Sequence, residues 1–197
     1  MLVLIATGIP KPVNKLCKQI GLSRTQLRRI TKRLESTGLI TPHRFSTGKV
    51  GGQLCFYEIT KFGWQILKKK GVLRPKSRTG GGFEHELAAK LIEQKGKRQG
   101  YSVQFEVDIQ GVRLDVLWLD RKYGKRSLFN IGVSSEKYEC NALFRIRELP
   151  IFQSSQVIMV ARDGKFRGRM RKILKAKDQQ GNILKQIQIK LIADFLT

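Results

Sequence analysis

Apolar residues recur at helical spacing in a basic stretch near the start of the chain. Leu27, Ile30 and Leu34 stand at i, i+3 and i+7, so a helix through them would bury one narrow apolar stripe. Ser23 and Gln26 have the three-residue separation of an N-terminal capping box. The pattern therefore predicts a short helix that begins after Ser23 and exposes most of its circumference.

The segments that flank this helix predict a second helix before it and a hairpin after it. Apolar positions at helical spacing occupy residues 13–20, and Gly21 supplies a tight connection. A polar and glycine-rich loop is expected over 41–53, and an alternating strand pattern follows over 54–59. A short amphipathic helix is expected over 60–71, so the predicted order is helix, turn, helix, hairpin, helix.

The second part of the chain combines helical and alternating patterns. We expect helices over 83–95, 136–149 and 166–177, strands over 103–107, 112–118, 128–133 and 157–161, and a last apolar segment over 183–196. Pro150 prevents the second of these helices from continuing, and the apolar run VIMVA is typical of a buried central strand. This order predicts a mixed α/β domain. A linker-like segment with one proline and three consecutive glycines precedes it.

Composition narrows the class of protein. The chain has 197 residues, of which 41% are hydrophobic, and this is enough for two globular domains. It contains no run of 18 apolar residues and no signal-peptide pattern, so we expect a cytoplasmic protein without a membrane span. Cys17, Cys55 and Cys140 lie far apart and form no CxxC motif, so neither a disulfide framework nor a cysteine zinc site is expected.

Positive charge is the strongest compositional signal. The chain carries 39 Lys and Arg against 15 Asp and Glu, a net charge of +24, which favours a phosphate polymer as the partner. Five of these cations lie on the basic helix predicted above: Arg24, Arg28, Arg29, Lys32 and Arg33. A solvated helix face is the alternative for such a cluster. Membrane binding is not expected, because the chain contains no lipidation motif.

The stretch LSRTQLRRITKRLESTGLI, followed by YEITKFGWQIL, resembles the winged-helix DNA-binding family over residues 1–71. The resemblance implies a short first helix over 1–6, a recognition helix that enters the major groove of double-stranded DNA, and a hairpin wing. The implied DNA-binding residues are Ser23, Arg24, Thr25, Gln26, Arg28, Arg29, Lys32 and Arg33 of the helix and His43, Arg44 and Lys49 of the wing. A capping role would instead occupy Gln26 locally. Because winged helices often act on symmetric sites, we expect a homodimer.

The second domain resembles the PD-(D/E)xK nuclease-like domain over residues 83–161, where Asp115 in RLDVLWLD is followed by the strand SLFNIGVS. In that family, carboxylates on adjacent strands hold divalent cations beside the scissile phosphate, and a lysine assists. The resemblance assigns Asp115 to the first acid and Glu84 to an acid on the first helix. The acid-x-Lys triplet falls on Asn130 and Gly132, which supply neither a carboxylate nor an ammonium group.

Two interpretations of this loss stay open. In the first, the domain keeps the fold without cleaving DNA, and it binds DNA or a protein partner. In the second, the missing groups have moved to Glu136 and Lys137 on the following helix, and Mg²⁺ is then the cofactor. A non-catalytic role for Asp115 is an ion pair with Arg113, and His85 is expected to be a surface residue.

The sequence therefore predicts an α+β protein with a winged helix over 1–74, a linker over 75–82 and an inactive nuclease-like α/β domain over 83–197. Its expected function is sequence-specific binding of double-stranded DNA without a cofactor or bound metal. Transcriptional control, or recognition of a DNA end or origin of a mobile element, fits such a protein. The alternative is a metal-dependent endonuclease with a migrated active site that the winged helix targets.

Overall fold

The computed structural model describes residues 1–7, 11–47, 49, 52–76, 80–133, 135–150, 155–178 and 186–196. The chain divides into two compact units, one formed by residues 1–45 and 53–77 and the other by residues 46–52 and 78–197. Both helices and strands are present, so the fold class is α+β, as expected. Residues 77–79 of the expected linker, and residues 48, 50 and 51 of the expected loop, lie outside the described residues.

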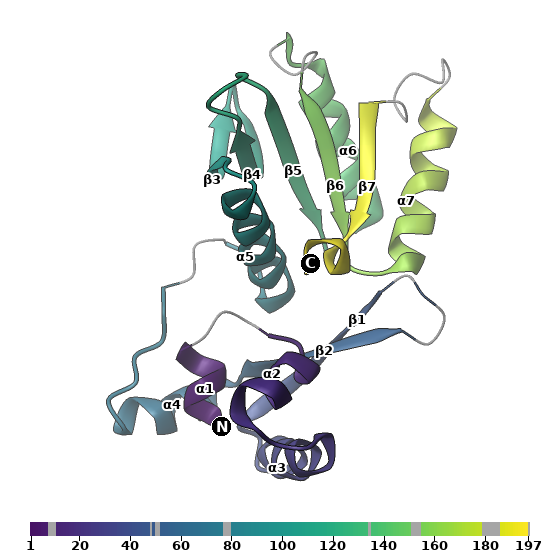
Figure 1. Cartoon of the computed structure of the whole chain (residues 1–197). Helices are drawn as coiled ribbons and strands as arrows, with labels where there is room; N and C mark the ends of the chain where they lie inside the picture. The colour runs from purple at the N-terminus through teal and green to yellow at the C-terminus, as the bar shows by residue number, and fades with distance from the viewer. Residues whose placement is uncertain are drawn as a thin grey trace. The chain divides into compact units, whose positions relative to one another are not determined.

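The predicted order of helix, turn, helix, hairpin, helix is confirmed in the first part of the chain (Figure 1). Its elements are α1 (Leu2–Thr7), α2 (Val13–Ile20), α3 (Arg24–Ser36), β1 (Ile40–Ser46), β2 (Gln53–Ile59) and α4 (Lys61–Lys69). Gly21 ends α2 with φ of 66°, and its N–H donates to the carbonyl of Cys17. A residue without Cβ adopts this left-handed cap at little cost, which explains the tight connection into α3.

Two small apolar contacts stabilise the first unit: one lies between α2 and α3, and the other between β1 and β2. Leu16, Cys17 and Leu27 are buried together between α2 and α3. Phe45 of β1 and Phe56 of β2 are fully buried and meet edge to face, with ring centroids 5.6 Å apart. Strand β1 extends to Ser46, so the expectation of a loop from residue 41 was wrong: residues 40–46 pair with β2, and Phe45 is buried against Phe56.

Helix α4 begins where it touches the base of the hairpin. The Thr60 hydroxyl accepts a hydrogen bond from the Gly63 N–H at 3.0 Å and donates one to the Gly38 carbonyl at 2.6 Å. Gly63 is buried, and a Cβ there would press on the Leu39 carbonyl oxygen and lie 2.7 Å from the Ile59 side chain. This close approach requires glycine inside a helix, where alanine is otherwise preferred.

The second unit is built on a five-stranded sheet in the order β3-β4-β5-β6-β7. Its elements are α5 (Phe83–Arg98), β3 (Ser102–Ile109), β4 (Val112–Leu119), β5 (Arg126–Gly132), α6 (Glu136–Glu148), β6 (Gln156–Ala161), α7 (Gly164–Lys177), β7 (Ile187–Leu191) and the 3-10 helix η2 (Ile192–Phe195). Strands β3, β4 and β5 form antiparallel pairs, and β6 and β7 continue the sheet in parallel. The sheet is therefore mixed, as expected.

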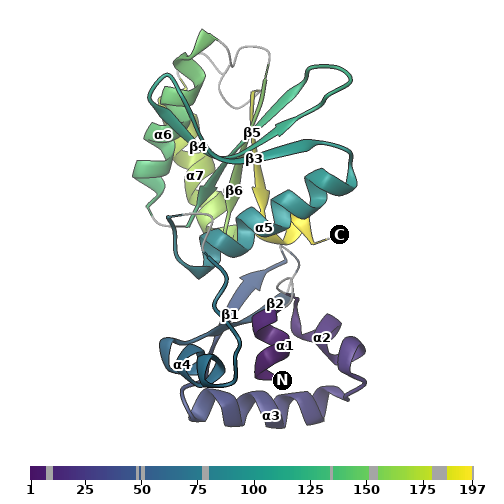
Figure 2. The ribbon, with the colours of Figure 1, turned by 90° about the vertical axis from the view of Figure 1, so that its left-hand side faces the viewer.

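Helices cover both faces of this sheet. Helices α6 and α7 share one apolar core with strand residues that include Leu128 and Met159. Helix α5 packs on β3, β4 and β5, on the face opposite α6 (Figures 1 and 2). All residues of β6 after Gln156 are buried, which explains why its sequence is a continuous apolar run instead of an alternating one.

A row of aromatic rings crosses the α5 side of the sheet. Trp118 stacks on Tyr101 at 5.2 Å and contacts Phe129 at 4.5 Å, and Phe129 contacts Phe195 at 5.9 Å. Gly96 of α5 lies against Trp118, where a Cβ would be 2.6 Å from the indole nitrogen. The helix runs through Gly96 to Arg98, so the expectation that it ends at residue 95 was wrong. Packing against the indole outweighs the weak helix propensity of glycine.

No helix in the described part of the chain is both long and apolar enough to cross a membrane.

We expect Gly63→Ala to destabilise the first unit by about 1–3 kcal/mol, because the methyl group would overpack the Leu39 carbonyl. Denaturant unfolding monitored by circular dichroism measures this change. Gly168→Ala is the matched control, since Gly168 is exposed in α7 and has no heavy atom within 4 Å of an added Cβ. The control should stabilise the chain by up to about 1 kcal/mol. Equal stability of the two variants would contradict the packing described for Gly63.

Candidate functional site

Helix α3 is fixed at its start by the predicted capping box. The Ser23 hydroxyl accepts from the Gln26 N–H at 3.2 Å, and the Gln26 side-chain oxygen accepts from the Ser23 N–H at 2.9 Å. Two backbone N–H groups that a helix start leaves unpaired are thereby satisfied. Both side chains are engaged within the helix end, so their first role is to set where α3 begins.

One narrow stripe of α3 is buried, and it differs from the predicted stripe. Leu27 and Thr31 are buried, whereas Ile30 is 36% exposed, so its assignment to the core was wrong. Thr31 lies four residues after Leu27, nearer the centre of the buried face than Ile30. The Thr31 hydroxyl donates to the Arg28 carbonyl at 3.2 Å, which satisfies this polar group inside the helix.

The remaining surface of α3 is a row of exposed cations. They are Arg24, Arg28, Arg29, Lys32 and Arg33, and Thr25 is exposed beside them. Within the described part of the chain, none of these five cations has an ion-pair partner. The only acidic residue of the helix is Glu35, close to its end. Helix α3 therefore carries a concentrated positive charge that its own unit does not neutralise.

The three residues predicted for the wing lie in different places. His43 and Arg44 belong to strand β1, whereas Lys49 is in the connection between the strands and is exposed. His43 Nε2 lies 2.9 Å from a carboxylate oxygen of Glu58 on the facing strand β2. Its side chain is 20% exposed. The structure therefore places His43 in a cross-strand pair, while Arg44 and Lys49 are exposed.

In the second unit, Asp115 lies at a point where the sheet pairing is interrupted. The β4–β5 ladder ends at the pair of Val116 and Phe129, although both strands continue past it. One Asp115 oxygen accepts the Ile131 N–H at 2.6 Å, in place of a strand partner. The other lies 3.0 Å from His85 Nε2 on α5. Arg113 pairs with Glu106 instead, so the alternative role of Asp115 as the ion-pair partner of Arg113 is wrong.

His85 is the residue of this site that the sequence did not predict. Its side chain is only 12% exposed, and Gly81 packs directly on its ring. Burial alone would lower the pKa of His85, but the hydrogen bond to Asp115 and the charges of Asp115, Glu139 and Glu106 outweigh burial and raise it. His85 Nδ1 is buried and has no hydrogen-bond partner among the described residues. The expectation of a surface histidine was therefore wrong.

Glu106 binds the backbone of Gly80, the first of the three consecutive glycines before α5. Its carboxylate accepts the Gly80 N–H at 2.7 Å and pairs with Arg113 at 2.6 Å. These two contacts, the Gly80 N–H first, lower the pKa of Glu106. Glu106 also adopts a left-handed backbone, with φ of 47°. A non-glycine residue in this region is strained, so the hydrogen bonds to its side chain stabilise an unfavourable backbone.

The aligned acid-x-Lys positions are buried in the sheet. The Asn130 amide donates to a Glu139 carboxylate oxygen at 2.8 Å, and both residues are 6% exposed. A Cβ on Gly132 would collide with the Met159 methyl group and lie 3.0 Å from the Phe166 ring. A lysine therefore has no room at Gly132. Glu139 was missed in the sequence, although it stands at i, i+4 and i+7 with two buried positions of α6, a pattern that marks a buried acid.

Of the two residues predicted as migrated partners, one is in an ion pair with α7 and the other is exposed. Glu136 forms an ion pair with Arg169 of α7 at 2.6 Å, and Lys137 is exposed. Glu84 lies in the first turn of α5 and is half-buried. Negative charge in a first turn interacts favourably with the helix dipole, so Glu84 can stabilise the start of α5.

The donor set around Asp115 does not fit a divalent cation. Both Asp115 oxygens are engaged, and Asn130 presents an amide N–H, not an oxygen, toward Glu139. No group of three or more His, Cys, Asp or Glu side chains among the described residues could hold a metal ion. Hard cations such as Mg²⁺ need several oxygen ligands, which the described side chains around Asp115 do not offer together.

Comparison with protein-family models, with curated proteins and with solved structures found no match to the chain.

We expect Asp115→Asn to destabilise the second unit more at acidic than at alkaline pH. The raised pKa of His85 means that folding stabilises its charged form; this contribution is full below about pH 6.5 and disappears as pH rises through the folded pKa. The variant should lose about 1–3 kcal/mol at pH 5.5 and less at pH 9. Urea unfolding of both proteins at the two pH values measures this. An equal loss at both would show that His85 does not carry charge in the pair.

Proposed function

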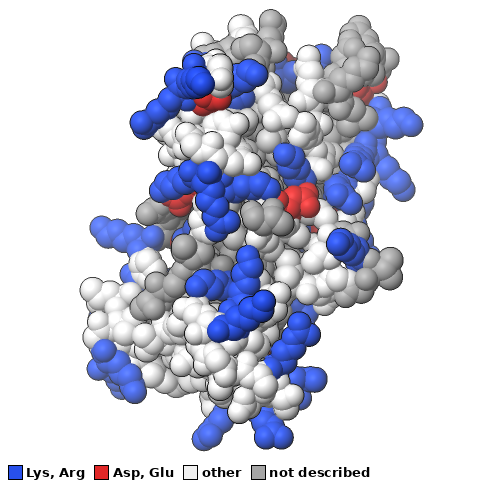
Figure 3. Space-filling model, viewed as in Figure 1, with Lys and Arg blue, Asp and Glu red and all other residues white. Residues whose placement is uncertain are grey.

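We propose that this chain is a sequence-specific double-stranded DNA-binding protein with a winged helix as its first unit. The observation that carries the proposal is the row of exposed cations on α3, which have no ion-pair partner among the described residues. The helix is capped at its start and held by a single buried stripe. The order of two helices, a hairpin and a further helix supports the winged-helix assignment. Figure 3 shows Lys and Arg spread over the visible surface with few Asp or Glu between them.

The geometry of α3 suits insertion into the major groove, which is wide enough to admit one helix. Residues near the start of such a helix contact base edges, so Arg24, Thr25 and Arg28 are the proposed base-reading residues. Lys32 and Arg33 lie farther along and are proposed to contact phosphates. Because the capping box occupies Ser23 and Gln26, their proposed contribution is to orient the helix start toward DNA.

We propose the hairpin as a wing that adds phosphate contacts. Arg44 and Lys49 are exposed and supply positive charge there. His43 contributes indirectly, because its contact with Glu58 joins the two strands. This division follows from charge, since an exposed guanidinium or ammonium group attracts phosphate at every sequence alike.

We propose that the second unit has a nuclease-like fold that binds without cleaving. The order of helix, three antiparallel strands, helix and parallel strand supports the fold. The engagement of Asp115 by His85 and Ile131 supports the loss of cleavage. Its partner is proposed to be DNA or another protein. A homodimer acting in transcriptional control, or on a DNA end or origin of a mobile element, fits this proposal.

Arg28→Ala tests the recognition helix. A preferred site is first selected from random double-stranded DNA with the parent protein, and affinities for this site and for a scrambled site are then compared at fixed salt. We expect the variant to lose about 1–3 kcal/mol at the preferred site and less at the scrambled one, because a base contact carries sequence information.

Lys69→Ala is the matched control, since it removes one exposed cation from α4 in the same unit. It should weaken both sites slightly and equally. If Arg28→Ala behaves like Lys69→Ala, α3 does not read bases, and a general electrostatic attraction remains as the explanation.

The alternative function is a metal-dependent endonuclease, and the buried acid Glu139 beside Asn130 is the observation that favours it. We expect no nicking of supercoiled plasmid by the parent protein in Mg²⁺ or Mn²⁺, because the carboxylates near Asp115 are engaged in internal hydrogen bonds. Nicking that disappears in Asp115→Ala would establish the endonuclease instead, and its loss in Glu136→Gln or Lys137→Ala as well would identify the migrated partners.

A further inference from the structure

Five of the seven cations of α7 form two groups that differ in their partners. Arg169 pairs with Glu136 at 2.6 Å, and Lys177 donates to the Asn141 side chain at 3.1 Å, so both are engaged with α6. Arg171, Lys172 and Lys175 are exposed, and within the described residues they have no ion-pair partner. One group therefore holds two helices together, and the other leaves positive charge available to a ligand.

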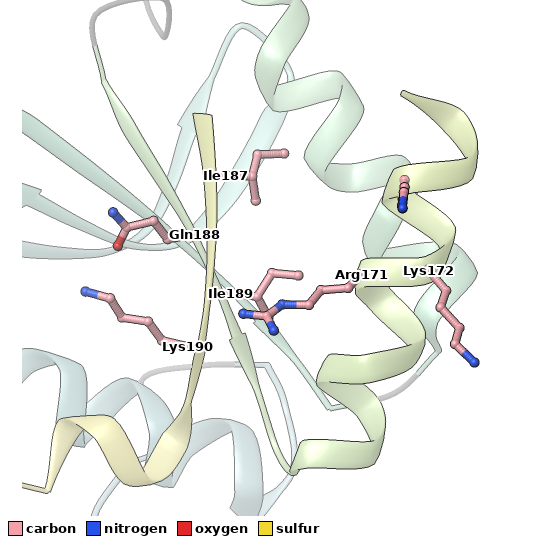
Figure 4. Close-up of a pocket in the computed structure, with 7 residues that line it drawn as sticks. Arg171, Lys172, Ile187, Gln188, Ile189 and Lys190 are labelled. Atoms are coloured by element: carbon pink, nitrogen blue, oxygen red, sulfur yellow. The ribbon is translucent and has the colours of Figure 1, made fainter. Parts of the chain in front are cut away.

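The second group lines a groove between α7 and strand β7 of about 620 Å³. Its lining residues are Arg171, Lys172, Lys175, Ile187, Gln188, Ile189 and Lys190. Figure 4 shows Ile187 and Ile189 pointing from β7 toward α7, and Arg171 extending from α7 toward β7. No acidic residue is among the lining residues. In Figure 4, Lys190 extends from β7 away from α7 and Lys172 extends from α7 away from β7, so Arg171 is the labelled cation that reaches over the apolar residues of the groove.

Gly168 makes this face of α7 unusually open. Arg171, Lys172 and Lys175 follow Gly168 by three, four and seven residues, so the four positions share one side of the helix. An added Cβ at Gly168 would meet no heavy atom within 4 Å. A glycine in the interior of an exposed helix is unfavourable relative to other residues. Here it leaves a strip of backbone without a side chain, one turn before the cations.

We propose that this groove binds the phosphodiester backbone of DNA. Arg171 and Lys175 stand about one helical turn of 5.4 Å apart, with Lys172 next to Arg171, and a nucleic-acid strand presents a regular row of negative charges to such a group. The edge of β7 away from β6 has no strand partner in the described sheet, so its backbone N–H groups add further donors. The ligand's identity rests on the proposed function, but the surface belongs to the second unit and is independent of α3.

An acidic peptide is the competing occupant, because it too could lie along a sheet edge. Peptides that add to a sheet edge gain specificity from pockets that receive alternate side chains. This groove offers only Ile187 and Ile189 as apolar lining. Its dominant feature is unpaired positive charge, which favours the phosphate backbone.

The test compares Gly168→Glu with Gly168→Gln in the full chain. The two side chains have the same length, both fit the open position, and only Glu introduces a negative charge among the cations. We expect Gly168→Glu to weaken binding to a random-sequence duplex by about fivefold or more, and Gly168→Gln by less than about twofold. Fluorescence anisotropy of a labelled duplex measures affinity, and circular dichroism confirms that both variants are folded.

Both variants are also made in an Arg28→Ala, Arg29→Ala background, which separates this proposal from the proposed function. If α3 does not bind DNA, the background changes do nothing, whereas the difference between Gly168→Glu and Gly168→Gln persists. Replacing Arg171, Lys172 and Lys175 together by Ala should lower the slope of log affinity against log salt by roughly 2–3. Equal DNA affinities of the Glu and Gln variants with an unchanged slope would overturn the proposal. Tighter binding of a labelled poly-glutamate peptide than of DNA would overturn it as well.

Discussion

The hydrogen bond from a backbone N–H to a carboxylate is the interaction on which the second unit depends. Five aspartates accept such a bond: Asp108 from Gly111, Asp115 from Ile131, Asp120 from Lys122 and Tyr123, Asp163 from Phe166, and Asp194 from Leu191. They fix hairpin turns, the interruption in the sheet pairing, the start of α7 and the end of the chain's last strand. An ionised acceptor strengthens each of these bonds relative to a neutral one.

This use of the acidic residues determines what happens to the basic ones. A chain with 15 acidic side chains and 39 basic ones cannot pair every cation, and several of the acids already accept backbone N–H groups. Much of the positive charge therefore lies outward, on α3 and on one side of α7. Mutual repulsion of these cations opposes compaction, and a polyanion that binds them relieves it. Under the proposed function, binding and folding would therefore be coupled through the same charges.

Local features were predictable from the sequence, and distant contacts were not. The capping box of Ser23 and Gln26 and the order of elements follow from residues a few positions apart. Thr31, not Ile30, is buried in the stripe of α3 because of how the helix is rotated against its neighbours. The hydrophobic periodicity does not define this rotation to within one residue. The contact of His85 with Asp115 joins positions 30 residues apart on a helix and a strand, and neither segment signals the other.

The aromatic row in the second unit has a spectroscopic consequence. The chain has two tryptophans, and each unit contains one of them. Trp118 is 6% exposed and is surrounded by Tyr101 and Phe129, whereas Trp64 in α4 is half-buried with the Arg74 guanidinium 6.0 Å from its ring. An indole enclosed by other rings emits in a less polar environment than one open to water and a cation. The emission spectrum therefore contains a separate reporter for each unit, and the loss of structure in one can be followed while the other stays intact.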